Sequence, residues 1–540
     1  MKKYRGMALM LGLCMALASA AGCGNSENNS AGTDGSVSSS LGESAAGSEG
    51  AAENDDTDSG DIAEITMVYM PAGSMPKGVA EVEAAINEIT EKEIHTHVNI
   101  EMIESGSYDQ QIGLMMASGE KLDLMLTFPV GASSYSNMVN QNQFMDISAL
   151  LKEYAPETVE TVGSLMEATT SGGEIYGVPT YRNLVVSAYI VMRTDVLEDL
   201  GLLEKAQNMT SFSEYEEILE AVKNSEKWGH LAGIVNSDLD GLCLPLAGFY
   251  LGTDKFSDTT TYDQLGDLNK IIAIDPEGGD PTVKMNFATD EYKAMVDKMR
   301  EWYEKGYVYK DAATTEDNGE VLLKNNAGFS YFIEGELGVE IAKAAAIGMP
   351  VTCVKIETHP LMTSSCTKFV WAVPHNATEP EAAVKFLNMM YTDSRIENLL
   401  LWGIEGRDYQ IKDGVACFVD GEDINTVAYH MADHMFGNQF LALPWDGQPK
   451  DFREQAKEEM DQVVQSKYFG FSCDTSAIQN ELTALANVIA EYGPSLESGI
   501  APEGTYEEFI EKLNSVNVQA VVDEYQAQLD AWLASEAGAF

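Results

Sequence analysis

Apolar and polar positions follow two alternating periods from residue 62 onward, where the chain first becomes rich in large side chains. Residues 64–70 alternate with the two-residue period of a strand, and residues 79–93 place apolar side chains at helical spacing. The pattern then predicts a strand, a helix and a strand over residues 97–103, 108–118 and 122–127. This order predicts βαβ units and a mostly parallel sheet covered by helices.

The carboxyl ends of these strands are the expected position of a binding site. In open α/β sheets, ligands lie in the crevice beyond those ends. Here the ends are residues 70–73, 105–108 and 128–131, each of which contains glycine, and two of which contain an aromatic residue.

The N-terminal region has the pattern of an export signal. Lys2, Lys3 and Arg5 precede an uncharged apolar run over residues 7–21, which is shorter than a membrane span needs. Small residues lead directly into Cys23, and this arrangement resembles a bacterial lipobox with Ala20 in the place usually held by leucine. Residues 1–22 are therefore predicted to be a signal peptide and Cys23 the acylated (for example palmitoylated) first residue. The alternative is an ordinary signal peptidase site beside an incidental cysteine.

A polar segment follows the predicted lipid site. Between Gly24 and Gly60 the only sizeable apolar side chains are Val37 and Leu41, and no Lys or Arg occurs between Arg5 and Lys77. Such a composition cannot bury enough apolar surface to offset the entropy of ordering it. Residues 23–61 are therefore predicted to be a lipidated, disordered acidic tether.

The body over residues 62–540 is too long for a single hydrophobic core and predicts two lobes. The chain has a formal net charge of −53, which argues against nucleic acid and against adhesion to anionic lipid. An acyl chain would then provide the only contact with the membrane. A strongly acidic surface also keeps an exported protein soluble.

Motifs of catalysis or cofactor binding are not evident in this chain. It contains no GxSxG, GxGxxG, GxxxxGK[ST] or HExxH sequence. His430 and His434 would share a helix face and could share a metal, with Asp433 nearby, but no third ligand is identifiable. Packing or surface histidines are the preferred interpretation, and we expect no cofactor and no metal.

Several segments, taken in order, resemble a known family. Gly119–Asp123, Gly173–Pro179 and Tyr189–Leu197 are typical of extracellular solute-binding lipoproteins of ABC importers, family 1 and carbohydrate-like. Residues 328–332 and 369–374 resemble later crossings between the lobes of this family. The remaining motifs resemble a Gram-positive subfamily with a dedicated C-terminal extension; they lie at residues 402–409, 436–441 and 470–475. The single motifs are weak, and their order carries the resemblance.

The resemblance implies an α/β fold of the two-lobe, periplasmic-binding-protein-like type II class, with a mainly helical C-terminal extension. Crossings between the lobes are expected near Val186, Gly328 and Pro374. The first lobe would comprise residues 62–186 and 330–374. The second would comprise residues 187–329 and 375–540, including the extension from about residue 395.

The resemblance also implies a function without catalysis. Such a protein, anchored by lipid at the extracellular face of the membrane and expected to be a monomer, delivers a solute to an ABC transporter permease, here a sugar or an oligosaccharide. Two alternatives remain open from the sequence. One is a binding protein for peptides or another small polar solute, and the other is a tethered surface glycoside hydrolase that uses a carboxylate pair.

Sugar sites combine flat aromatic rings with side chains that bind hydroxyls. Residues of these types stand at strand ends, near the expected crossings and in a glycine-containing loop. The predicted ligand residues are Tyr108, Asp109, Tyr181, Arg182, Asn183, Phe332, Glu334, Trp371, Trp402, Glu405, Arg407 and Trp445. For each aromatic residue, packing in a core is the structural alternative.

Overall fold

The computed structural model describes residues 61–237, 252–256 and 262–537. The predicted signal peptide, Cys23 and all of the predicted tether except Asp61 lie outside these residues. Within them, no helix combines the length and the apolar character that crossing a membrane requires.

The first sheet has the strand order β2-β1-β3-β13-β6. Its strands are β1 (Ala63–Tyr69), β2 (Thr96–Met102), β3 (Leu124–Leu126), β6 (Val178–Pro179) and β13 (Val370–Ala372). The predicted parallel pairing of β1 with β2 and β3 is confirmed. Strand β13, which comes from far along the chain, runs antiparallel to β3 and β6, so the sheet is mixed.

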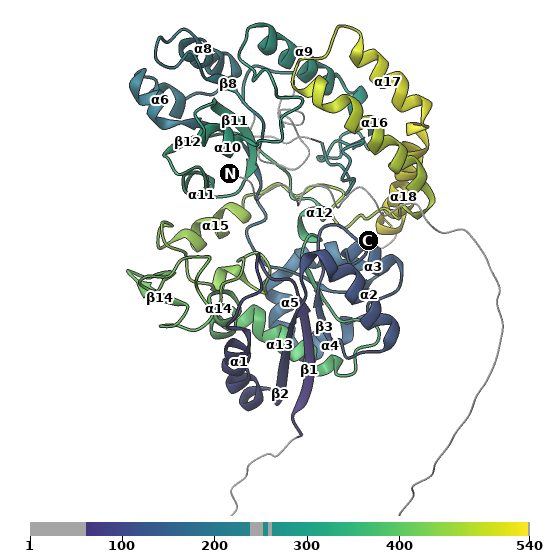
Figure 1. Cartoon of the computed structure of the whole chain (residues 1–540). Helices are drawn as coiled ribbons and strands as arrows, with labels where there is room; N and C mark the ends of the chain where they lie inside the picture. The colour runs from purple at the N-terminus through teal and green to yellow at the C-terminus, as the bar shows by residue number, and fades with distance from the viewer. Residues whose placement is uncertain (1–60, 238–251, 257–261, 538–540) are drawn as a thin grey trace, which may run out of the picture. The chain divides into compact units, whose positions relative to one another are not determined.

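Helices from two distant parts of the chain cover this first sheet (Figure 1). They are α1 (Val79–Glu93), α2 (Tyr108–Ser118), α3 (Tyr135–Asn140), α4 (Ser148–Tyr154), α5 (Pro156–Val162), α13 (Pro380–Thr392) and α14 (Ser394–Trp402). The bounds of α1 and α2 agree with the sequence prediction. Helix α2 ends where Gly119 adopts a left-handed conformation with φ of 72°, which glycine tolerates without steric cost.

The second sheet has the order β12-β7-β11-β8. Its strands are β7 (Ser187–Arg193), β8 (Ala232–Ile234), β11 (Gly328–Gly335) and β12 (Val351–Thr358). Strand β7 is almost fully buried and pairs antiparallel with β11 on one side and β12 on the other. The helices of this part are α6 (Thr194–Asp199), α7 (Leu203–Gln207), α8 (Phe212–Lys223), α9 (Asp290–Glu304), α10 (Gly319–Lys324) and α11 (Val339–Ile347).

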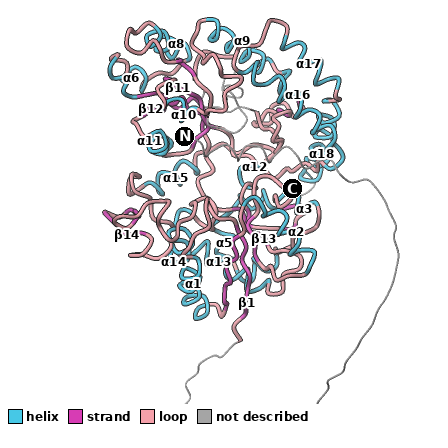
Figure 2. The backbone as a smooth tube through the Cα atoms, viewed as in Figure 1, coloured by secondary structure: helices cyan, strands magenta, loops and turns pink. Residues whose placement is uncertain are grey.

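The C-terminal helices extend the core of the second sheet. They are α16 (Gln479–Glu497), α17 (Thr505–Ser515) and α18 (Val518–Ala537), and Leu485, Phe509 and Leu529 are buried in the same cluster as Phe332 of β11. The short α12 (Thr363–Cys366) and α15 (Phe452–Met460) lie in segments dominated by loops, as Figure 2 shows. Three small ladders complete the described strands: β4 (Thr170–Ser171) with β5 (Glu174–Ile175), β9 (Ile272–Ala273) with β10 (Lys284–Met285), and β14 (Tyr409–Lys412) with β15 (Val415–Phe418).

Strand pairing corrects the expected lobe boundaries. Residues 330–374 were expected in the first lobe, but β11 and β12 pair with β7 in the second sheet. Gly328 therefore begins a strand of the second sheet and is not a crossing. Residues from 375 were expected in the second lobe, but α13 and α14 are buried against the first sheet, because their apolar faces join its core.

The described chain passes between the two sheets at three places. The first lies between β6 and β7, which agrees with the crossing expected near Val186. The second lies between β12 and β13, before the expected position at Pro374. The third follows α15, where Phe469 is buried in the core of the first sheet and Phe471 in the core of the second.

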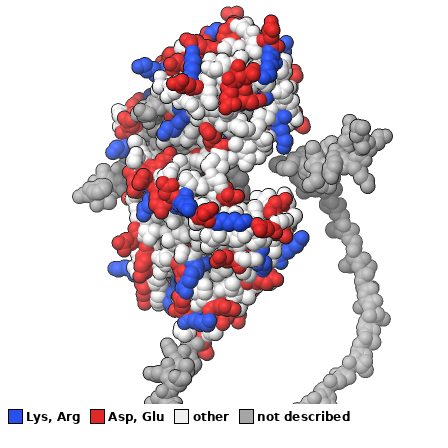
Figure 3. Space-filling view, turned by 90° about the vertical axis from the view of Figure 1, so that its left-hand side faces the viewer, with Lys and Arg blue, Asp and Glu red and all other residues white. Residues whose placement is uncertain are grey.

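The surface agrees with the acidic composition. On the face shown in Figure 3, Asp and Glu are spread widely, and Lys and Arg are scattered between them without a continuous basic area. This face offers no footprint for nucleic acid, whose binding needs clustered positive charge.

Candidate ligand-binding site

A cavity of about 410 Å³ is lined by residues from both sheets' loops and from all three crossings. Its walls come from the loop after β3, the first crossing, the loop before β9, strand β11, the second crossing and the start of the C-terminal helices. The contributing residues are 129–131, 134–137, 184, 186, 262, 264–268, 270, 334, 359, 360, 362–365, 367, 368, 471–473, 475 and 525. The predicted strand end at residues 128–131 thus forms part of a cavity wall.

Asp109 fixes the loop after β3. Its carboxylate accepts hydrogen bonds from the backbone N–H groups of Ala132 at 2.9 Å and Ser133 at 3.0 Å, and a short one from the Ser133 hydroxyl. Partial burial opposes ionisation, but these hydrogen bonds outweigh it and lower the pKa of Asp109. Gly131 has φ of 94°, and a Cβ there would collide with the Asp109 carboxylate, so glycine is required. The loop is therefore held rigidly, with Ser134, Tyr135 and Asn137 in the cavity wall.

Two buried aspartates fix the facing loop over residues 262–270. Asp267 accepts hydrogen bonds from the backbone N–H groups of Asn269, Ile271 and Ile272 at 3.0, 2.6 and 3.0 Å. Asp263 accepts one from Leu265 at 2.7 Å and another from the Ser466 hydroxyl at 2.6 Å. Burial raises the pKa of both carboxyls despite these bonds.

This fixed loop presents chemically varied side chains to the cavity. Tyr262, Gln264, Leu268 and Lys270 all contribute to the wall. Leu268 is 68% exposed and Val130, from the loop after β3, is 62% exposed. They give the cavity apolar surface that a ligand could cover.

Several charged groups lie close together on the wall of the cavity. The ammonium of Lys270 lies 3.8 Å from the carboxylate of Glu334. Burial opposes ionisation of Glu334, but His359, Lys270 and Lys368 outweigh it and lower its pKa. Burial lowers the pKa of Lys368, and the charge of Arg182 adds to this effect. Lys368 is nevertheless exposed, because it lies on the wall of the cavity.

Of the twelve predicted ligand residues, all within the described ranges, only Glu334 lines this cavity. Four of the predicted aromatics belong to cores; three of them are Tyr108, Phe332 and Trp371. Tyr108 is 2% exposed and donates a hydrogen bond to the carbonyl of Leu126 at 2.7 Å. Phe332 stacks on Trp302 with ring centroids 6.1 Å apart, and the indole N–H of Trp371 donates to the carbonyl of Met435 at 3.0 Å. Their burial corrects the prediction of ligand platforms.

Tyr181, Arg182 and Asn183 connect segments beside the first crossing. Tyr181 bridges to Asn438, and its ring packs edge-on against Phe440. Arg182 is buried and forms an ion pair with Glu336 at 3.2 Å, and the Asn183 amide donates to Glu459 at 3.3 Å. Their side chains thus contact neighbouring protein segments, and none of the three lines the cavity.

The glycine-containing loop after α14 also has a structural role. Trp402 is 3% exposed and packs against Trp445 with ring centroids 4.7 Å apart. Arg407 pairs with Asp408 at 2.6 Å and donates to the carbonyl of Gly78 at 3.3 Å, which ties this loop to the start of α1. Glu405 is exposed and lies away from the cavity lining. The packing alternative therefore describes Trp402.

The two candidate metal-binding histidines do not share a helix face, because residues 430–434 are not helical. His430 lies among the rings of Trp402, Phe418 and Trp445, while His434 packs against Phe369 at 4.7 Å. Burial lowers the pKa of both imidazoles. Within the described ranges, no three His, Cys, Asp or Glu side chains are grouped as a metal site.

Sequence reasoning missed most residues of the cavity wall. Tyr262 lies in a loop without periodic pattern, and Lys368 and the Thr363–Ser365 hydroxyls lie in the second crossing. The available signal was the run of small hydroxyl residues between two apolar strands.

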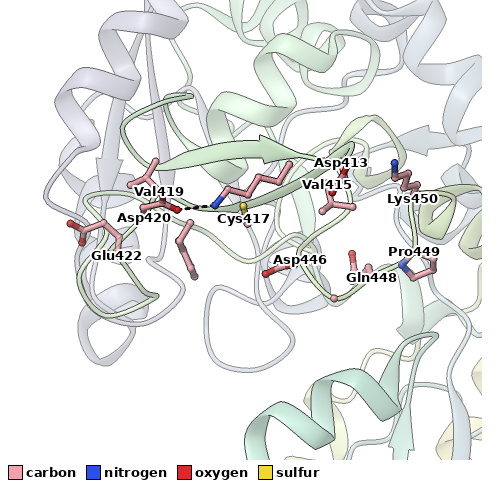
Figure 4. Close-up of a pocket in the computed structure, with 14 residues that line it drawn as sticks. Asp413, Val415, Cys417, Val419, Asp420, Glu422, Asp446, Gln448, Pro449 and Lys450 are labelled. Atoms are coloured by element: carbon pink, nitrogen blue, oxygen red, sulfur yellow. Dashed lines mark hydrogen bonds and ion pairs between the residues drawn. The ribbon is translucent and has the colours of Figure 1, made fainter.

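A second, larger hollow of about 730 Å³ lies beside the β14–β15 hairpin (Figure 4). Two of its charged groups, Lys412 and Asp420, pair with each other at 2.8 Å. Its lining residues come from the hairpin, from residues 419–422 directly after it and from the nearby loop over residues 446–450. The cavity at the crossings, which unites distant segments, is therefore the candidate ligand site.

The two sheets, their crossings and the cleft define a two-lobe binding protein. The family model for bacterial extracellular solute-binding proteins matches residues 84–403, more than half of the chain, and the chain belongs to this family. A second model, of a domain of unknown function, matches residues 467–534.

Individual relatives extend this result over most of the chain. A protein of Streptococcus pneumoniae serotype 4, described as a carbohydrate ABC transporter substrate-binding protein, is 22% identical over 489 residues, covering 88% of this chain and 92% of its own. Lipoprotein LipO of Bacillus subtilis is 24% identical over 352 residues, covering 61% of this chain and 64% of its own. The crystal structure of the N-glycan transport solute-binding protein NgtS from Streptococcus pneumoniae has a TM-score of 0.73 at 19% identity, covering 88% of this chain and 100% of that one.

Proposed function

We propose that this protein binds an oligosaccharide in the cavity at the crossings and delivers it to an ABC transporter permease. The composition of the wall carries the proposal. Eight of the lining residues are serine or threonine, and they stand beside Gln264, Asn137, Lys270 and Glu334. Many hydroxyl and amide groups with few charges suit a ligand that carries many hydroxyls. The volume of about 410 Å³ is that of a small-ligand site.

Relatives support the choice of carbohydrate. One is described as a carbohydrate substrate-binding protein, and NgtS has been crystallised in complex with Man1GlcNAc and Man5GlcNAc. The half-exposed ring of Tyr262 is the candidate platform for a sugar face. Burial and a hydrogen bond with the neighbouring Glu291 raise its pKa to about 12, so its hydroxyl stays protonated.

Binding without catalysis fits the carboxylates of the cavity. The described lining contains two, Asp267 and Glu334. Asp267 already accepts three backbone hydrogen bonds that hold its own loop. A glycoside hydrolase needs a pair of carboxyl groups free to act on the same bond, and Glu334 lacks such a companion in the described wall.

Anchoring through Cys23 is part of the proposal. It is supported by the lipobox-like sequence before Cys23 and by the similarity to a protein named as a lipoprotein. A monomer held at the extracellular face by acyl chains alone would capture ligand in solution and present it to the permease.

A melting-temperature screen tests the ligand class. The full-length mature chain carrying Cys23→Ser is heated with Man1GlcNAc, Man5GlcNAc, malto-oligosaccharides, fructo-oligosaccharides and a mixture of tri- to pentapeptides. A ligand at one hundred times its dissociation constant stabilises the folded state by about 2.7 kcal/mol, which gives a clear shift. A shift with peptides and none with any sugar would refute the proposal. Shortened glycans after incubation would instead indicate the hydrolase.

A further inference from the structure

The C-terminal module, residues 467–534, matches a family model whose function is unknown. Five of its residues nevertheless line the candidate ligand cavity: Phe471, Ser472, Cys473, Thr475 and Tyr525. They come from the segment that opens the module and from α18. The module therefore reaches the site directly, although α16 packs against α9, and α17 against α16, in the core of the second sheet.

The segment that faces the cavity is fixed from both sides. The Gln528 amide accepts from the backbone N–H of Asp474 at 2.8 Å and donates to the Asp474 carbonyl at 2.8 Å. On the other side, the N–H of Gly470 donates to the Thr363 hydroxyl of the second crossing at 2.9 Å. The segment is thus braced between α18 and a cavity wall.

Its entry point is also tied to the two cores. Phe469 is buried with the first sheet and Phe471 with the second, where Phe471 packs edge-on against Trp532 of α18 at 5.9 Å. The N–H of Ser466 donates to the carbonyl of Leu361 at 2.9 Å. The third crossing therefore runs beside the second and carries the module to the cavity.

The groups that this segment exposes are suited to a polyhydroxylated ligand. Ser472 is exposed and Thr475 is half-buried. The Thr475 hydroxyl accepts a hydrogen bond from the Gln479 amide at 2.9 Å and keeps its own proton to donate. Cys473 is 9% exposed, and burial raises the pKa of its thiol to about 12, so the thiol stays protonated and unreactive. Tyr525 is 2% exposed and supports the segment from behind.

We propose that the C-terminal module forms a specificity-determining wall of the ligand site, in which Ser472 and Thr475 bind hydroxyls of the oligosaccharide. This inference rests on the proposed function and assigns a role to the region whose role is unknown. The wall has a fixed backbone, so it limits which ligands fit the cavity and does not adapt to them.

Substitution at Ser472 tests the wall. Ser472→Ala removes one hydroxyl and is expected to weaken binding about fivefold, as for the loss of one hydrogen bond. Ser472→Trp places a large ring in the cavity and is expected to weaken binding of Man5GlcNAc at least tenfold. Asn480→Trp is the matched control, because Asn480 is exposed in the same module outside the cavity lining.

Isothermal titration with every oligosaccharide of the panel gives the affinities, and the melting temperature of each unliganded variant checks folding. Loss of affinity in both Ser472 variants with an intact control supports the wall. If the wild-type protein binds a glycan and Ser472→Trp binds it with the same affinity, the proposed role of the C-terminal module is wrong, and the proposed function still stands. Wild-type chain that binds none of the glycans overturns the proposed function and this inference together.

Discussion

Glu397 should make the free energy of unfolding depend on pH. It lies in α14 and is fully buried in the core of the first sheet. Burial raises its pKa to about 8, and the neighbouring backbone of Asn438 and the charge of Arg453 offset only part of this effect. The folded protein therefore holds this carboxyl protonated at neutral pH.

The sign of the effect follows from the difference between folded and unfolded states. The unfolded chain has the ordinary pKa of 4.5, so between pH 4.5 and pH 8 it releases a proton that the folded chain keeps. Stability must fall as the pH rises through this window. Each pH unit contributes about 1.4 kcal/mol, which gives an upper limit of roughly 3 kcal/mol between pH 4.5 and pH 7.

Glu397→Gln removes the titration and keeps a side chain of similar size. Urea unfolding at several pH values, followed by fluorescence of the buried tryptophans of the first core, measures the free energy of unfolding. The wild type is expected to lose roughly 3 kcal/mol more than the variant between pH 4.5 and pH 7. Only this difference in slope is compared, so any constant cost of the buried amide cancels.

Glu497→Gln is a control that tests whether the effect is specific to the core in which the carboxyl is buried. Glu497 is buried at the end of α16 in the second core, and burial raises its pKa to about 7. Its pH-dependent difference should appear in unfolding of the second core and level off near pH 7. If wild type and Glu397→Gln change in parallel across the whole window, Glu397 is ionised in the folded state and the reasoning is refuted.

Three further predictions concern anchoring, packing and the ligand platform. Cys23→Ser should move the protein from the membrane fraction to the medium or leave it unprocessed, and an unmodified mature N-terminus in wild-type mass spectra would contradict this. Trp402→Ala should cost about 3–5 kcal/mol of stability while glycan affinity stays unchanged, because Trp402 packs in a core; titration showing lost affinity at unchanged melting temperature would restore it as a platform. Tyr262→Ala should weaken glycan binding about tenfold whereas Tyr262→Phe keeps most of it, and equal losses would show that the hydroxyl, not the ring, binds.

Local patterns predicted the beginning of the fold well. Residues 79–93 and 108–118 are helices with the expected bounds, since apolar spacing and the glycine after α2 act within one element. Lobe membership was less predictable. Strand β11 was assigned to the wrong lobe because its partner β7 lies more than a hundred residues away, and no local signal records that pairing.

The site was harder to predict than the fold. Trp371 and Tyr262 are both large aromatics, and only their surroundings distinguish them. Trp371 stands in a strand between two neighbours and is fully buried, whereas Tyr262 stands in a loop held open by buried aspartates. Residue type alone therefore predicts a ligand-binding role equally for Trp371 and Tyr262. The strand end at residues 128–131 was found because sheet topology, rather than side-chain chemistry, places it.

The discontinuity of both cores has a consequence for how the chain matures. The first sheet lacks β13 until residue 372 has emerged, and the second core lacks its last helix until α18 is complete. A chain that emerges N-terminus first, from a ribosome or through a membrane pore, therefore exposes incomplete cores for most of its passage. Contacts between distant segments also slow folding. Such an architecture therefore disfavours a stable fold before nearly all of the chain has emerged.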